Sequence, residues 1–268
     1  MTVPFLSRIR IYPVKSLDPV ELQEAEIGIH SLKYDREFAM LAEDGRFING
    51  KRTGAVNQLK AEYDLAKQVI HLSARSGGEV ESFHMVNDKA LIERYMTTFF
   101  GLTTHWLHHT KGELMDIPTA CSVSVVSEAS LQSLQHDLNG YDLENIRLRF
   151  RANLEIGGVL PFWEDKLFGA PGTGIRFKVG DVEMIGVSPR ARCNVPPRDP
   201  FTGDTDKSFI KSMMKSRADS LPADSLLPQH GNMYHLTVNT YLPETERGKI
   251  LRLGDKVEII ETVQLQTT

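Results

Sequence analysis

The chain has 268 residues, of which 41% are hydrophobic and 25% are charged, proportions of a soluble globular protein with one large or two small domains. Its 31 Lys and Arg residues against 35 Asp and Glu residues give a net charge of −4, which disfavours broad binding to nucleic acid or to anionic membranes. No apolar run approaches the ~18 residues of a spanning helix, residues 1–10 lack a secretion-signal pattern, and two cysteines cannot form a disulfide framework, so we expect a reduced, cytoplasmic protein without a membrane span.

Short strands separated by turns are predicted for the first hundred residues. Phe5, Ile9 and Ile11 are spaced for strand alternation, and Pro13 ends this run because it has no N–H to donate. Further strands are expected over 21–27, 37–41, 61–65, 69–72 and 81–86. Asp44-Gly45 is a strong hairpin turn. Strands this short at this spacing favour a barrel or a sandwich over a doubly wound sheet.

Two helices are predicted, each bounded by capping residues. Asn87 begins the first helix and Gly101 ends it, whereas Ser127 begins the second and Asn139-Gly140 ends it. Their expected buried stripes are Leu91, Tyr95 and Phe99 in the first, and Leu131, Leu134 and Leu138 in the second.

The region between these helices, 111–118, is the expected domain junction, which divides the chain into domains 1–113 and 114–268. The second half returns to strands, because Gly180-Asp181 and Gly254-Asp255 are turns that each feed a strand. Such turns are typical of the corners of a β-barrel. A short helix is expected around 207–215 in an otherwise polar segment. The pattern as a whole predicts a mainly β fold with some α (α+β).

Two patterns that are common in functional sites are incomplete here. Gly45–Lys51 nearly forms a phosphate-binding P-loop, but Arg52 stands where Ser or Thr would hold magnesium. His105, His108 and His109 have no cysteine near them in sequence, and the last two would face opposite ways on a strand. We therefore expect neither a nucleotide P-loop nor a zinc site.

The two cysteines have different surroundings. Cys193 lies in a stiff, proline-rich loop with Arg190 and Arg192, whose charges would favour the thiolate form that attacks electrophiles or binds metal. Cys121 precedes a predicted strand and has the character of a small core residue. Cys193 is therefore the candidate reactive or metal-binding residue.

Arg147, Arg149 and Arg151 alternate with apolar residues, which on a strand would place three guanidinium groups on one face. Like charges so close together either extend into water or share an anion. Together with Lys15 and Arg36, this row makes a plausible anion pocket in a protein of net negative charge.

Seven motifs, in order along nearly the whole chain, resemble those of the MOSC (molybdenum cofactor sulfurase C-terminal) family. They are Tyr12-Pro-Val-Lys-Ser16, Asp35-Arg36, Ser127-Glu-Ala-Ser-Leu131, Phe150-Arg-Ala-Asn153, Gly180-Asp-Val182, Arg192-Cys193 and Asp199-Pro-Phe-Thr-Gly203. The likeness is greatest to the subgroup of the amidoxime-reducing components. It implies an N-terminal MOSC β-barrel-like domain over 1–113 and a MOSC β-barrel domain with flanking helices over 114–268.

The resemblance also implies a cofactor and the residues that hold it. The cofactor would be a molybdenum–pterin (molybdopterin) group, with its metal bound to the thiolate of Cys193, the implied catalytic residue. The implied cofactor contacts are Lys15, Ser16, Arg36, Thr119, Cys121, Ser122, Arg151, Asn153, Arg192 and Asn232. The chain departs from the family pattern at Leu17, where a cysteine is common, and at Thr119, where an acidic residue is common.

The resemblance implies an enzyme, a molybdenum-cofactor-dependent oxidoreductase that reduces small N-hydroxylated compounds. Two alternatives stay open: a carrier that holds a persulfide on Cys193 for metal–sulfur cluster assembly, and a pyridoxal-phosphate-binding module with Lys15 as its Schiff-base lysine. Two cysteines are too few for an iron–sulfur cluster. We therefore expect electrons to come from a separate donor protein of the ferredoxin, flavodoxin or cytochrome type.

Overall fold

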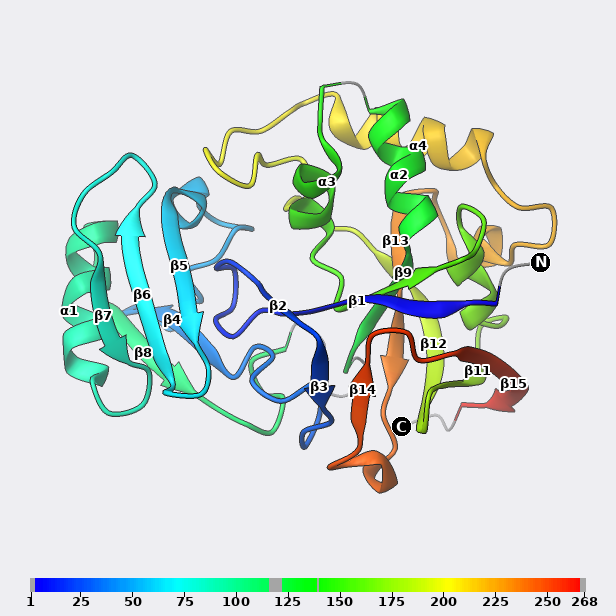
Figure 1. The fold of residues 1–268 in the computed structure, drawn as a ribbon. Coiled ribbons are helices and arrows are strands. Elements are labelled where there is room, and N and C mark those ends of the chain that lie inside the picture. Colours follow the sequence, from blue (N-terminus) through cyan, green and yellow to red (C-terminus); the bar gives the residue numbers. More distant parts are fainter. Residues whose placement is uncertain (1–2, 116–121, 139, 266–268) are drawn as a thin grey trace.

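The computed structural model describes residues 3–115, 122–138 and 140–265, which form a β-barrel, a smaller β-rich lobe and a group of helices (Figure 1). The strands are β1 (Phe5–Ile11), β2 (Val20–Leu22), β3 (Glu24–Glu26), β4 (Phe38–Ala42), β5 (Leu59–Asp64), β6 (Val69–Ala74), β7 (Glu81–His84), β8 (Thr104–His108), β9 (Ser124–Ser127), β10 (Leu154–Gly157), β11 (Thr173–Val179), β12 (Val182–Ala191), β13 (His235–Tyr241), β14 (Ile250–Arg252) and β15 (Val257–Gln264). The α-helices are α1 (Lys89–Phe100), α2 (Glu128–Asp137), α3 (Leu143–Phe150) and α4 (Phe209–Asp219), and the short 3-10 helices are η1 (Gly54–Gln58), η2 (Trp163–Leu167), η3 (Leu227–His230) and η4 (Glu244–Glu246). The expected α+β fold, with more strand than helix, is confirmed.

The largest sheet closes on itself. Its strands follow the order β15-β11-β12-β13-β9-β10-β1-β2, and β9 and β10 are parallel. Phe5 of β1 bridges Lys256, Leu6 N donates to Asp255 O over 2.8 Å, and Gly254 N donates to Leu6 O over 2.8 Å. Strand β1 therefore pairs with the start of β15 as well as with β10, which closes a barrel around a buried apolar core.

A second lobe, residues 38–108, lies to one side of the barrel (Figure 1). Strand β4 pairs with β8, and the sheet β5-β6-β7 lies beside them. Helix α1 belongs to the same lobe and contributes Ile92 and Met96 to its core. The chain enters and leaves the lobe at one place, because His109 N donates to Glu37 O over 2.8 Å. The lobe therefore behaves as an insertion between two segments that are already neighbours.

The predicted helix boundaries are largely confirmed. The stripe predicted for α1 is wrong at Leu91, whereas its Tyr95 and Phe99 are partly buried against the core of the lobe. Gly101 ends α1 in the left-handed conformation at φ 67°, and the Ser127 side chain caps α2 by accepting from Ser130 N. In α1, however, Leu91 is 41% exposed and the buried residues lie one position later, at Ile92 and Met96. Helix α4 is longer than the expected 207–215 and buries Phe209 and Met213 with α2 and α3.

The predicted strand with a row of arginines is wrong, because Leu143–Phe150 forms α3 and Arg151 follows as its left-handed C-cap. The Asp142 side chain caps the helix by accepting from Asn145 N, and Ile146 and Phe150 lie one turn apart on the buried face. Residues two positions apart on a helix do not share a face, so Arg149 separates from Arg147, and Arg151 leaves the helix as its left-handed cap. Arg147 Nε lies 2.9 Å from Glu155 Oε1, whereas Arg149 Nη1 donates to Pro196 O and Arg198 O.

Strands of the first half of the chain also build the barrel of the second half. Strands β1 and β2 belong to the large sheet, and β3 pairs with β14 in a separate two-stranded sheet, with Ala25 opposite Leu251. The division into domains 1–113 and 114–268 stays a prediction. If either part folds alone, its strands that pair across this boundary lose their partners.

Candidate functional site

A cavity of about 410 Å³ gathers candidate residues from both halves of the chain. It is lined by Lys15, Ser16, Arg36, Asn49, Lys51, Met115, Phe150, Arg151, Ser188, Pro189, Arg190, Ala191, Arg192, Cys193, Val195 and Asn239. The turn after β1, the turn before β4, the end of α3 and the end of β12 contribute to its wall. The predicted residues that it brings together are Lys15, Ser16, Arg36, Arg151, Arg192 and Cys193.

The described lining of this cavity carries cations and no carboxylate. The cationic side chains are Lys15, Arg36, Lys51, Arg151, Arg190 and Arg192. Such a concentration of positive charge in a concave surface raises the local concentration of anions. Of the residues of the predicted anion pocket, Lys15, Arg36 and Arg151 line this cavity, whereas Arg147 and Arg149 do not. A helix end and loops carry them rather than an arginine-bearing strand, and the binding of an anion stays a prediction.

Arg36 is held in place from three directions. Its guanidinium donates to the buried Asp35 carboxylate, to Asn153 Oδ1 over 3.3 Å and to Arg151 O over 3.2 Å. Asp35 in turn accepts from Tyr12 N over 2.8 Å. These bonds orient the guanidinium before any ligand arrives, which reduces the entropy lost on binding.

Arg151 lies over the aromatic ring of Tyr12, as Arg36 does. The Tyr12 ring centroid is 4.0 Å from Arg151 Cζ and 4.8 Å from Arg36 Cζ. Burial lowers the pKa of Arg151, which measures the cost of holding its charge away from water. Within the described part of the chain, the buried Arg151 Nη2 has no hydrogen-bond partner. An anionic ligand would supply one.

Three residues of the cavity wall hold a strained backbone conformation. Ser16, Arg36 and Arg151 have φ angles of 72°, 55° and 54°, in the left-handed region that non-glycine residues rarely adopt. Each such residue costs about 1–2 kcal/mol. The surrounding contacts offset this cost and hold the three polar side chains toward one cavity.

Cys193, the cysteine within the described residues, is half-buried on the loop that follows β12. Its carbonyl accepts from Tyr234 Oη over 3.1 Å. Further along, Arg149 Nη1 donates to Pro196 O and to Arg198 O, each over 2.8 Å. The Cys193 loop, residues 192–206, is therefore fixed to the helical side of the molecule.

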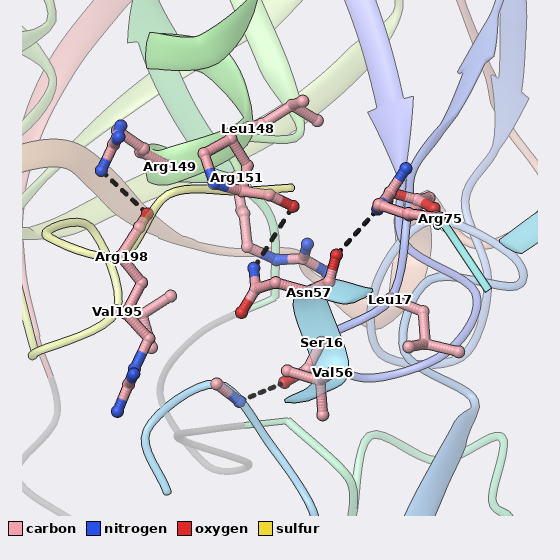
Figure 2. A pocket seen from close by; sticks show the side chains of 13 residues that line it. Ser16, Leu17, Val56, Asn57, Arg75, Leu148, Arg149, Arg151, Val195 and Arg198 are labelled. Carbon is pink, nitrogen blue, oxygen red and sulfur yellow. Dashed lines mark hydrogen bonds and ion pairs between the residues drawn. The ribbon is translucent and has the colours of Figure 1, made fainter. Parts of the chain in front are cut away.

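The same loop is fixed to the second lobe across a narrow cleft of about 40 Å³ that adjoins the cavity through Ser16, Arg151 and Val195. Figure 2 shows Asn57 and Arg75 on one side of this cleft and Arg149 and Arg198 on the other. Asn57 Nδ2 donates to Pro200 O over 3.4 Å.

Two glycines make this contact possible. A Cβ on Gly203 would lie 2.4 Å from Gly54 O, and one on Gly54 would lie 2.8 Å from Gly203 O. The turn of the Asp199–Gly203 motif therefore packs backbone against backbone on η1, and we call this contact the Gly54–Gly203 clasp.

Several predicted cofactor contacts lie outside the lining of the cavity. Asn153 is buried and uses its amide on Ser124, Arg10 O and Arg36. The carbonyl of the buried Ser122 accepts from Ser31 Oγ. Asn232 Oδ1 accepts from Tyr234 N. Their contacts with a cofactor stay predictions, and Thr119 and Cys121 lie outside the described residues.

Sequence reasoning missed Lys51 and Asn49 as residues of the cavity wall. Both lie in the incomplete P-loop pattern, which we set aside because it lacks the magnesium-binding residue. Gly50 N donates to Ser16 Oγ over 3.3 Å, so the turn that carries these residues rests on the predicted Lys15-Ser16 segment. The adjacent basic residues Lys51 and Arg52 were the feature of the sequence that could have indicated this part of the cavity wall.

Comparison with known proteins agrees with this arrangement. Residues 3–105 match the family model of the MOSC N-terminal beta barrel domain, and residues 107–258 match that of the MOSC domain. Mitochondrial amidoxime reducing component 2 of Rattus norvegicus is 25% identical over 293 residues, which cover 94% of this chain and 82% of that protein.

Molybdenum cofactor sulfurases are also similar to this chain. The Homo sapiens protein is 23% identical over 263 residues, with 79% of this chain and 28% of the sulfurase covered. The Caenorhabditis briggsae protein is 23% identical over 235 residues, with 80% and 32% covered. The chain thus spans about a third or less of the length of these sulfurases.

Within the ranges that the structure describes, no helix is both long and apolar enough to cross a membrane.

Proposed function

The chain belongs to the MOSC family, and on that premise we propose that it is a molybdenum-cofactor-dependent oxidoreductase that reduces N-hydroxylated compounds. The observation that carries the proposal is the shared cavity, in which the Cys193 thiol and a set of cations from both family domains meet. The likeness to an amidoxime reducing component over 94% of the chain supports this activity.

The cavity fits a molybdenum–pterin cofactor in three respects. The described lining is cationic, as a phosphate-bearing group requires. The buried Arg151 Nη2 has no hydrogen-bond partner in the described structure, so a ligand oxygen would satisfy it. Cys193 offers a thiolate, a soft ligand suited to a redox metal.

Different residues would hold different parts of this cofactor. Cys193 would bind the metal, while Lys15, Ser16, Arg36 and Arg151 would hold the phosphate and the pterin. Arginine suits a phosphate because its planar fork donates two parallel hydrogen bonds, whereas lysine acts as a point charge. The bonds from Arg36 to Asp35 and Asn153 keep that fork oriented.

When bound, the cofactor supplies a two-electron redox centre for the conversion of an N–OH group, two electrons and two protons to N–H and water. The chain positions the N–OH group by confining a small substrate to the cavity beside Cys193. We propose that the electrons come from a separate protein of the ferredoxin, flavodoxin or cytochrome type.

Metal and pterin analysis of the protein, made in a host supplied with molybdenum, tests the proposal. We expect about one molybdenum and one pterin per chain, and reduction of benzamidoxime to benzamidine with reduced methyl viologen as the donor. Protein without molybdenum that carries sulfane sulfur on Cys193 would instead support a persulfide carrier. An aldimine absorbance that borohydride abolishes, with Lys15 modified, would support a pyridoxal-phosphate module.

A further inference from the structure

A second cavity, of about 460 Å³, lies between the barrel and the second lobe, and its described lining shares no residue with that of the cavity beside Cys193. The barrel contributes the turns after β3 and before β14, and the lobe contributes the turn after β7 and the end of β8. Cavities of about 300–1,000 Å³ hold small organic ligands, and about 150 Å³ already holds benzene. This cavity therefore has room for a ligand of one or two rings.

Much of the lining of this cavity is apolar. Phe38 and Met85 are buried in its wall, and the His108 ring lies parallel to the Phe38 ring, with 4.3 Å between centroids and 6° between planes. Ile29 of the barrel and Val86 of the lobe line it while 47% and 42% exposed. An apolar ligand in the cavity would remove these two side chains from water, which favours its binding.

One largely buried carboxylate lines the same space. Glu37 directly precedes β4, and only 15% of its side chain is exposed. Its Oε1 accepts from Tyr34 N over 2.8 Å, whereas its Oε2 lies 3.9 Å from His108 Nε2, too far for a hydrogen bond. Among the residues that the structure describes, Glu37 forms no ion pair with a lysine or an arginine. Its Oε2 can therefore accept from a ligand.

The other charged groups of the lining do not neutralise Glu37. Lys33 and Arg247 are half-exposed and each pairs with another glutamate, with 2.8 Å and 3.2 Å between nitrogen and oxygen. Burial lowers the pKa of His108, so its ring is neutral at pH 7. Burial also raises the pKa of Glu37, which measures the cost of keeping this charge away from water. A bound cation would offset that cost.

We propose that this cavity is a binding site for a small organic cation, an ammonium or amidinium group on an apolar body of one or two rings, and that Glu37 recognises the charge. The cation would donate to Glu37 Oε2, and hydrogen bonds between opposite charges are the strong ones. The apolar body would cover Ile29 and Val86. Because Arg36 lines the cavity beside Cys193, one turn of the chain contributes to both cavities. The inference does not depend on the proposed function.

Three ligands of similar shape test the proposal. 2-Naphthylmethylamine is the cation, 2-naphthylmethanol is its neutral counterpart and 2-naphthoate is the anion. Ligand-observed NMR titrations of the whole chain at pH 7, in about 0.15 M salt, measure the dissociation constants. We expect the amine to bind at least about 10-fold more tightly than the alcohol, because a hydrogen bond to a buried charge is worth such a factor. The anion should bind most weakly, since Glu37 repels it.

Two variants assign the binding to this cavity. Glu37→Gln keeps an acceptor for Tyr34 N and removes the charge, so the affinity for the amine should fall to that for the alcohol. Val86→Trp fills the cavity from an exposed position and should weaken the binding of the amine at least about 10-fold. Glu43→Gln is the matched control, because the exposed Glu43 directly follows β4 and lies outside the lining. It should change the dissociation constant by less than about twofold.

The outcomes separate this site from the cavity beside Cys193. Equal affinity for the three ligands, or amine binding that Val86→Trp leaves unchanged, would overturn the inference. An equal loss in Glu37→Gln and Glu43→Gln would also overturn it, because the net charge of the chain would then attract the amine. Neither Glu37 nor Val86 lines the cavity beside Cys193, so both variants should keep their molybdenum and reduce benzamidoxime. A parent protein that does neither would contradict the proposed function and leave this inference standing.

Discussion

Cys193 is the side chain on which the proposed chemistry depends most directly, and its replacement separates ligation from folding. In Cys193→Ser, a hydroxyl that stays protonated near neutral pH replaces a soft thiolate. We expect molybdenum content and benzamidoxime reduction to fall at least about 10-fold, while the melting temperature stays within about 2 °C because a half-buried loop residue of similar size is exchanged. Pterin is expected to remain in part through the cationic contacts.

Metal analysis, pterin fluorescence and a melting curve measure these three quantities. Cys121→Ser separates the two expectations for the other cysteine: as a core residue it should retain molybdenum and most of the activity, whereas as the cofactor contact that the resemblance implies it should lose part of both. Full molybdenum content in Cys193→Ser would refute the assignment of the metal ligand.

Arg151 and Arg147 offer a second comparison, because they belong to one run of sequence and have different surroundings. Arg151 lines the cavity, whereas Arg147 pairs with the buried Glu155, with Arg147 Nε 2.9 Å from Glu155 Oε1. Arg151→Ala should lower pterin retention several-fold. Arg147→Ala should retain pterin but lower the free energy of unfolding by about 2–4 kcal/mol, since it leaves a buried carboxylate without its main partner.

Urea unfolding and pterin content after gel filtration measure the two effects. Equal loss of pterin in both variants would mean that the arginines act as a general basic surface and would argue against the cavity as the cofactor site.

Glu164 predicts a dependence of stability on pH. It is buried, Ser127 N and Ser130 Oγ donate to its Oε2, and burial raises its pKa above the ordinary value of 4.5. A carboxyl group whose pKa is higher in the folded state contributes stability that is fully present below about pH 4.5 and is lost as the pH rises through the folded-state value. Glu164→Gln keeps an acceptor for both donors and removes the charge.

We therefore expect Glu164→Gln to raise the melting temperature by about 2–4 °C at pH 7, equivalent to about 1 kcal/mol, and to change it little at pH 4. Melting curves between these pH values measure the trend, with the exposed Glu79→Gln as a control. A gain that is the same at both pH values would show that packing, and not ionisation, is responsible.

At the scale of single elements, α3 shows where a sequence pattern misleads. The alternation of Arg147, Arg149 and Arg151 with apolar residues has the period of a strand. Two local features favour the helix instead: Asp142 caps its first turn, and Ile146 and Phe150 recur at helical spacing. A strand period and a helix period both fit these eight residues. The Asp142 cap and the burial of Ile146 and Phe150 are the features that distinguish the helix from a strand.

The Gly54–Gly203 clasp predicts that a methyl group on Gly203, ten residues after Cys193 in the same loop, disturbs that loop. In Gly203→Ala, the new Cβ would lie 2.4 Å from Gly54 O at a φ of +81°. We expect the free energy of unfolding to fall by about 2–4 kcal/mol, the sum of backbone strain and overpacking. In a Cys121→Ser background, alkylation of Cys193 by iodoacetamide should become faster, because its loop is less firmly held.

Gly45→Ala is the matched control for backbone strain alone, since Gly45 has a φ of +75° and no atom within 4 Å of its ideal Cβ. It should cost about 1–2 kcal/mol and leave the alkylation rate unchanged. An unchanged alkylation rate in Gly203→Ala would show that the clasp does not position the Cys193 loop.

At the scale of the whole molecule, the shared strands predict how the chain can be divided. Residues 114–268 alone lack β1, which pairs with β10 and with the segment 254–257 that leads into β15. We expect this fragment to show no cooperative thermal transition. A chain in which a short Gly-Ser turn replaces residues 38–108 should keep one, because Glu37 and His109 are already hydrogen-bonded. Circular dichroism during heating measures both, and cooperative unfolding of 114–268 alone would contradict the expectation.

Local chemistry allowed much of the fold and part of the site to be predicted from sequence. Caps such as Ser127 and turns such as Gly180-Asp181 act over a few residues, so the helices and hairpins that they bound were predictable. The barrel closure between Phe5 and Lys256 joins residues 251 positions apart, which no local pattern encodes. The same limit explains why the family motifs indicated Arg151 and Cys193 while Lys51 was missed.

That closure also sets an order of events during synthesis. The ribosome releases β1 long before one of its partners, the segment 254–257, which follows β1 by more than 240 residues. Until then β1 and β3 have no complete partners, whereas the lobe of residues 38–108 contains its own strand pairs and can form early. Contacts between such distant residues slow folding and prolong the exposure of unpaired strands. Lys15 follows β1 and Arg36 follows β3 along the chain. We therefore expect the cavity to form only after the segment 254–257 has been made.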